Sequence, residues 1–380
     1  MKRSFSVILA LVITLGFPFT VYSAETLKYN MTLDYLDEYA ENNDDIYTIE
    51  NLNIQKDNYE FQKINLESQI KSLESELSST AIDERNSVKV QIFELEKQLE
   101  EINYELSLFD DNKLYEQARI SLKSEVLSSY IELYYIDLQI KLNKESVNYY
   151  KNLSESQTAL FENGKVTENA AEISKAHYNS AKNDLKSAER KLPFAKKSLA
   201  FLFNHYQDEY YSFKIEKPIK DTSFQTSEET LSETFLNENV DLLRLENKIK
   251  IEENYLEKCK PLWGADSSSV KIQENVIKQC EMEYERTKKQ LSLSAAKAYS
   301  EYESAVEAYK DSLAYIKVLN ESRRINKVLY DEGEISKLDY LKNDLQYSNE
   351  IFATHEDYFN LIIIVDSLKA IEYGIINIEQ

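Results

Sequence analysis

The chain has 380 residues and a formal net charge of −22. This acidic balance excludes nucleic acid as a partner, because no basic surface remains to neutralise phosphates, and it argues against docking on anionic lipid. Five glycines and four prolines leave too few turns for an all-β protein, and apolar residues at helical spacing predict a mostly all-α fold.

The first residues resemble a secretory signal. Lys2 and Arg3 form a short basic start, residues 7–19 are apolar, and a small-residue cleavage site follows, most simply after Ala24. The alternative is an uncleaved anchor, but the apolar stretch is too short to span a bilayer with margin, and no later stretch approaches ~18 apolar residues. We therefore predict an exported cell-envelope protein whose residues 1–24 are removed.

Residues 64–108 carry two heptad runs. Apolar residues recur in steps of four and three from Leu66 to Leu77 and, after a polar break, from Val88 to Leu106. Such spacing forms a seam for a second helix. The two runs predict an antiparallel coiled-coil hairpin, with one long helix as the alternative.

Two glycines are predicted to form the tips of two further helical hairpins. Gly164 and Gly333 stand in matching stretches, and glycine there takes the left-handed conformation that closes a helix. Thr167 and Ser336 suit the N-caps of the returning helices. Between the hairpins, residues 204–230 are predicted to be a linker in which Tyr210–Ile215 forms at most one short strand.

The chain is a tandem duplication. Gly164 and Gly333 occupy matching positions 169 residues apart. Matching residues at the starts of the two halves are 196 residues apart. The first half therefore carries 27 extra residues, where the heptad hairpin lies. We predict a first helical repeat at 25–203 with a coiled-coil insert at about 64–108, and a second repeat at 231–375.

These features, in this order, resemble the TolC-type outer-membrane efflux family, whose protomers are duplicated in this way. Residues 31–63 are similar to the family's opening helices, both tips to its motif of Gly, any residue, an aliphatic or Thr, then Ser or Thr, and residues 203–221 to its equatorial linker. The resemblance covers most of residues 25–375.

The resemblance implies a homotrimer in which each protomer gives four helical strands to a twelve-helix tunnel. One end would meet a periplasmic adaptor that works with an inner-membrane transporter. The implied function is an efflux or export conduit of the envelope that hydrolyses nothing itself. The alternative is a non-conducting exported coiled-coil scaffold or adaptor-like structural protein.

The resemblance also implies roles for individual residues. Asp339 stands where the family has its entrance ring of aspartates, and Tyr330 where a tyrosine joins the closing network. Lys342 replaces a second ring aspartate, so a double acidic ring is not expected. The adaptor-docking residues would be those of the two tips: Gly164, Lys165, Val166, Gly333, Glu334 and Ile335.

One departure from the family concerns its membrane strands. These need ~9–11 residues of alternating apolar and polar character. The first half has the heptad hairpin at that position, and the second has residues 259–281, where Pro261 and Gly264 indicate a short loop. We therefore expect the tunnel part of the family without its membrane strands.

No catalytic, cofactor or metal site is predicted. The histidines lie apart, no nucleophile stands at a recognisable spacing, and no phosphate-binding loop occurs. Cys259 and Cys280 could form one disulfide or remain two free thiols. Trp263 could anchor that end of the molecule to a partner or simply cap the bundle. The histidines are His177, His205 and His355.

Overall fold

A computed structural model gives the fold of most of the chain. The predicted signal lies outside the part that it describes. Within that part the chain is almost wholly helical, which confirms the mostly all-α prediction, and β1 (Tyr29–Asn30) pairs in parallel with β2 (Tyr211–Ser212). The described residues are 29–30, 32–43, 47–82, 84–202, 211–212 and 215–376.

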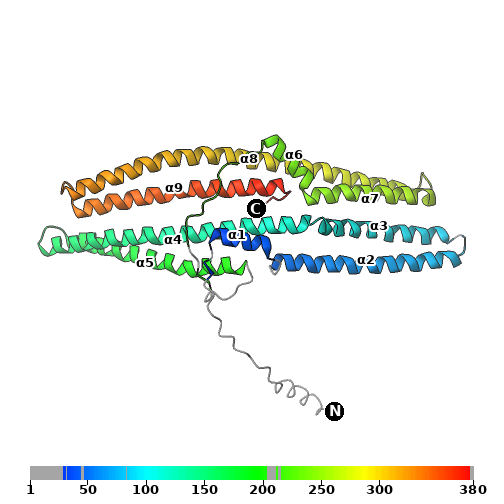
Figure 1. Cartoon of the computed structure of the whole chain (residues 1–380), viewed down its shortest axis with the longest axis horizontal. Coiled ribbons are helices and arrows are strands. Elements are labelled where there is room, and N and C mark those ends of the chain that lie inside the picture. Colours follow the sequence, from blue (N-terminus) through cyan, green and yellow to red (C-terminus); the bar gives the residue numbers. More distant parts are fainter. Residues whose placement is uncertain are drawn as a thin grey trace, which may run out of the picture.

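The molecule is a long slab of helical hairpins (Figure 1). At one end the helices contact each other in the order α5, α4, α9, α8, and at the other in the order α2, α3, α7, α8. The edges of the slab are therefore α2 and α5 on one side and α8 on the other. The long helices are α2 (Tyr47–Ser79), α3 (Arg85–Asp110), α4 (Lys113–Glu162), α5 (Glu168–Phe201), α7 (Val240–Trp263), α8 (Ser268–Asp331) and α9 (Lys337–Glu372).

The heptad segment folds as an antiparallel hairpin and not as one long helix. Helices α2 and α3 pack along a seam that buries Leu66, Ile102 and Leu106. The second half has a hairpin at the same place, formed by α7 and the beginning of α8. The chain reverses after Ser79 and after Trp263, so both positions at which the resemblance places membrane strands hold helical hairpins here.

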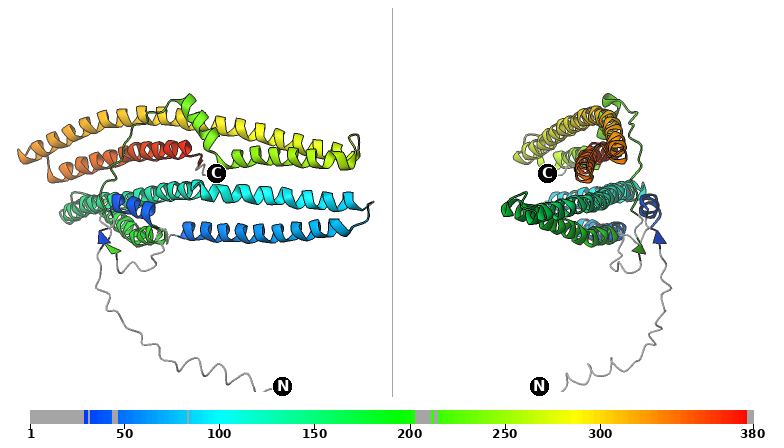
Figure 2. Two further views of the ribbon diagram at one scale, coloured as in Figure 1. Left: turned by 45° about the vertical axis from the view of Figure 1, so that its right-hand side comes forward. Right: turned by 90° about the vertical axis from the view of Figure 1, so that its left-hand side faces the viewer.

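A belt covers one face of the slab at its middle (Figure 2). Helix α1 (Leu33–Asn42) packs on α4, and α6 (Glu228–Glu238) packs on α8 and α9. The linker is tied down by tyrosines of the slab, since the Tyr358 hydroxyl donates to the carbonyl of Pro218 at 2.8 Å. The only second layer in the described fold lies here, and it holds the largest buried cluster.

The two repeats are joined by different kinds of contact at different points along the slab. Beside the belt, α4 and α9 meet through aromatic rings such as Tyr134 and Phe359, 5.8 Å apart. Towards the far end, α3 and α7 meet through charged groups: Glu105 accepts two bonds of 2.8 Å from Arg244. Glu252, only 4% exposed, accepts from Lys97 at 3.3 Å.

The structure decides one of the open alternatives. Cys259 and Cys280 are both buried and unpaired, so there is no disulfide. The half-buried Trp263 ring packs edge-on against Tyr255 of the same helix, with ring centroids 5.8 Å apart. Within the described residues, no helix combines the length and the apolar character that a membrane span requires.

Helices α6, α7 and α9 meet at a tight joint in the middle of the slab. The Asn239 amide donates to the carbonyl of Gly374 at 2.9 Å. Gly374 has φ +79°, and a Cβ atom there would lie 2.3 Å from the carbonyl oxygen of Glu238. Gly264, at the far end, has φ +88°, but its surroundings are open.

We predict that Gly374→Ala destabilises the fold more than Gly264→Ala. Both changes place a Cβ atom on a left-handed backbone, which lowers the free energy of unfolding by about 1–2 kcal/mol. Only Gly374→Ala adds a clash with backbone, worth about 1–3 kcal/mol. Urea unfolding followed by circular dichroism measures both variants, and equal midpoints would contradict the tight joint.

Candidate functional site at the hairpin tips

The first tip joins α4 to α5 by a helix-closing turn. Gly164 has φ +69°, and the Lys165 amide donates back to the carbonyl of Leu160 at 2.8 Å. This is the bond of a Schellman motif, which requires a left-handed residue before it. The Thr167 hydroxyl then caps α5 by accepting from the amide of Ala170 at 3.3 Å.

The second tip repeats this geometry between α8 and α9. Gly333 has φ +77°, and the Glu334 amide donates to the carbonyl of Leu329 at 2.9 Å. The Ser336 hydroxyl accepts from the amide of Asp339 at 3.1 Å. The predicted turn and N-cap are therefore present at both tips.

Both tips lie at the same end of the molecule (Figure 1). Lys165 and Glu334 are exposed there, whereas Val166 and Ile335 are half-buried in the turns. At each tip the glycine is thus followed by one exposed charged side chain and one half-buried aliphatic side chain. Within the described chain, no group of three or more His, Cys, Asp or Glu could hold a metal.

Asp339 and Tyr330 lie just behind the second tip. The Asp339 carboxylate is exposed in the first turn of α9 and accepts from the Ser336 hydroxyl at 2.6 Å. Tyr330 stacks on Tyr340, with ring centroids 4.7 Å apart. Burial is the first reason why the pKa of Tyr149 on α4 is raised, and the electrostatic effects of Tyr150 and Asp339 raise it further.

A polar network below the second tip fastens α8 to α9. Arg323 donates two bonds to the Asp344 carboxylate, at 2.6 and 3.0 Å. Its guanidinium also lies 3.8 Å from the Glu145 carboxylate of α4, so it links the two hairpins. The hydrogen bond to Asp344 is the main reason why the pKa of Arg323 is raised.

Sequence reasoning did not find this network, although the sequence carries a signal for it. Arg323 stands ten residues before Gly333 and Asp344 eleven after it, so an antiparallel hairpin centred on that glycine brings them level. The same folding-back pairs Asn326, which is buried, with the carbonyl of Tyr340 at 3.1 Å.

We predict that Arg323→Met lowers the free energy of unfolding by about 1–3 kcal/mol, because it leaves a half-buried carboxylate unpaired. Arg324 is a matched control: it makes the same two-bond contact, but to Glu321 on the exposed face of its own helix. Arg324→Met should cost less than about 0.5 kcal/mol. Urea unfolding compares the variants, and similar losses would refute the role of the network.

Comparisons with known proteins identify the fold. No sequence family and no curated protein matches the chain. Among solved structures, a membrane protein from Pseudomonas aeruginosa is similar with a TM-score of 0.59 at 13% identity, over 90% of this chain and 91% of that one.

Two outer membrane channels are similar as well. The CmeC channel of Campylobacter jejuni has a TM-score of 0.54 at 15% identity, over 92% of this chain and 87% of that one. The MtrE channel of Neisseria gonorrhoeae, in its open state, has a TM-score of 0.55 at 15% identity, over 92% of this chain and 90% of that one. The resemblance to the TolC-type family is therefore confirmed at the level of the fold: the described chain has the architecture of these outer membrane channels.

Proposed function

We propose that the chain is a TolC-like conduit component of an envelope transport system for efflux or export. It would assemble as a homotrimer and dock a periplasmic-adaptor-type partner, coupled to an inner-membrane transporter, through its tips. The observation that carries this proposal is the distribution of exposed apolar side chains over the slab.

Large exposed apolar side chains gather on the edge helices. On the inner helices α3, α4, α7 and α9 the described part has one such side chain, Phe161 beside the first tip. Burying a side chain of this size stabilises an interface by about 1.5–3 kcal/mol. On the edges they are Tyr47, Ile54, Phe61 and Ile64 of α2, Ile173, Phe194 and Phe201 of α5, and Ile272, Met282, Leu293, Leu313, Tyr315, Val318, Ile325 and Val328 of α8.

The spacing of these residues suits helical partners. Tyr47, Ile54 and Phe61 recur every seven residues on α2, as do Val318 and Ile325 on α8. A heptad spacing of this kind forms a seam for another helix. The two edges consist of different helices, so the natural contact joins the α2 and α5 edge of one copy to the α8 edge of the next.

A contact of this kind between unlike edges is heterologous, and it closes into a ring when the rotation allows. The occupant that we propose for each edge is therefore a second copy of this chain. We propose three copies because the resemblance to the TolC-type family implies a homotrimer. The belt covers one face of the slab, so the other face would line the interior of the ring, and all tips would lie at one end of it.

Adaptor docking rests on the paired tips. Lys165 and Glu334 carry opposite charges at one end of the molecule, each beside a half-buried aliphatic residue. Rim charges of this kind set the rate and specificity of association more than its affinity. The ring would present this pair of tips once per protomer.

We expect the chain from Glu25 onward to elute as a trimer when light scattering follows size exclusion without detergent. Phe61→Glu or Val318→Glu, at edge positions that are 65% and 60% exposed, should yield monomers, because a charge enters the seam. Ile82→Glu is the control: Ile82 is 83% exposed but lies in the far turn.

A stable monomer of the unaltered chain would contradict the conduit and favour the non-conducting scaffold. An aggregate that only detergent disperses would instead indicate a membrane-facing surface, which the ring proposal does not contain.

Charge exchange at the tips tests docking. We expect Lys165→Glu with Glu334→Lys to weaken capture of the cognate adaptor by about tenfold, because both contacts become repulsive. Lys186→Glu, on the exposed face of α5 far from the tip, is the control. Binding assays with the trimer immobilised on a surface measure the capture of the adaptor. Unchanged capture by the tip variant would disprove tip docking.

A further inference from the structure

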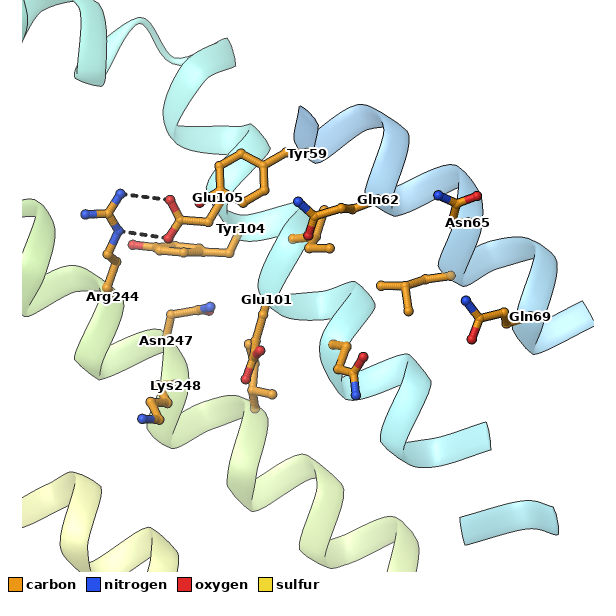
Figure 3. Close-up of a pocket in the computed structure, with 14 residues that line it drawn as sticks. Tyr59, Gln62, Asn65, Gln69, Glu101, Tyr104, Glu105, Arg244, Asn247 and Lys248 are labelled. Carbon is orange, nitrogen blue, oxygen red and sulfur yellow. Dashed lines mark hydrogen bonds and ion pairs between the residues drawn. The ribbon is translucent and has the colours of Figure 1, made fainter. Parts of the chain in front are cut away.

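A groove of about 650 Å³ lies over α3, between α2 and α7 (Figure 3). Its floor is a narrow apolar strip formed by Leu66, Ile102 and Ile251. Gln62 from α2 and Asn247 from α7 point into it from opposite sides. Its volume is within the range of small-molecule sites.

The groove lies on the face opposite the belt. Leu243 and Glu246 of α7 line a separate hollow together with residues of α6, which belongs to the belt. Arg244 and Lys248 of the same helix line the groove instead. Successive helical positions turn by about 100°, so these pairs face different sides of α7. In the proposed ring the groove therefore faces the interior.

The walls of the groove are rich in side-chain amides. Five of the lining residues are Gln or Asn, and within the described residues no hydrogen bond is made by any of the five side chains. Each amide offers two donors and one acceptor oxygen, so it can serve a ligand that both donates and accepts. The five residues are Gln62, Asn65, Gln69, Gln98 and Asn247.

The charges of the groove cancel, although the chain as a whole has a net charge of −22. Arg244 is already held by two bonds to Glu105. Lys248 and Glu101 are the other charged lining residues, one of each sign. A neutral wall of this kind gives no general attraction for cations or anions.

Two tyrosines complete the lining. Tyr59 and Tyr104 are half-buried, and burial is the first reason why the pKa of each is raised, so both hydroxyls stay protonated at neutral pH. Their rings give flat apolar faces with a polar tip. Flat rings beside amides suit a ligand with apolar C–H faces and hydroxyl edges.

We propose that this groove binds a neutral oligosaccharide, which is a class of cargo or envelope ligand for the proposed conduit. Sugar hydroxyls both donate and accept hydrogen bonds, and so do the five side-chain amides. The C–H faces of the sugar rings would pack on the tyrosine rings and on the apolar floor. Tyr59 to Gln69 spans about 15 Å along α2, which accommodates a short oligosaccharide.

The test is calorimetric titration of the chain from Glu25 onward with two neutral sugars, maltotetraose and tetra-N-acetylchitotetraose. We expect saturable binding of at least one of them that 0.5 M NaCl leaves unchanged, because the ligand is neutral. Gln62→Ala with Asn247→Ala should weaken it about tenfold, the loss expected for two hydrogen bonds. Tyr104→Leu should weaken it as well, whereas Tyr104→Phe keeps the ring.

Asn275→Ala with Gln279→Ala is the matched control, since these two amides are exposed on α8 outside the groove. It should leave binding within about twofold of the unaltered chain, while circular dichroism verifies that every variant is folded. Absence of binding by both sugars, equal losses in groove and control variants, or binding of tetra-alanine in their place would overturn the proposal.

The groove is formed entirely by one protomer. The sugar-binding proposal therefore depends on the proposed function only for the position of the groove inside a ring. Light scattering on the same samples separates the two proposals. Sugar binding by a monomer would support the groove and contradict the ring. A trimer that binds no sugar would contradict the groove alone.

Discussion

The constraint on which this structure depends is that its slab is one helix thick. A helix in such a layer has two lateral neighbours and cannot bury its remaining surface within the same chain. Stability must therefore come from strips of contact along seams, as between Leu66 and Ile102, and not from a central core. Within the described residues, the fold gains a second layer only at the belt, where Leu231 and Phe235 of α6 are fully buried against α8 and α9.

The same constraint explains why the two edges differ from everything between them. An inner helix has a partner on each side, so within the described residues its exposed positions carry almost no large apolar side chain, Phe161 being the exception. An edge helix has one partner, and the side chains that would meet the missing one remain in solvent, as Phe61 and Val318 do. The apolar edges are thus a consequence of single-layer construction, and a ring removes both edges at once.

Much of this fold could be predicted from spacing, because hairpins are local structures. The heptads around Leu66 and Ile102, the glycines at both tips and the duplication are all visible in the sequence. The far hairpin of the second repeat could not be predicted in this way, since α7 lacks an unbroken heptad run. Nor could the groove, because Gln62 and Asn247 meet only through the seam between the repeats, which no local period records.

The seam between α3 and α7 also explains why the groove is open and polar. Arg244 with Glu105 and Lys97 with Glu252 hold the repeats together by charges, and a charged pair needs water or further hydrogen bonds around it. An apolar seam would have drawn α2 and α7 together over α3 and closed the space. Holding the repeats by ion pairs at this end keeps the side chains beside them, Asn247 and Tyr104 among them, accessible to a ligand.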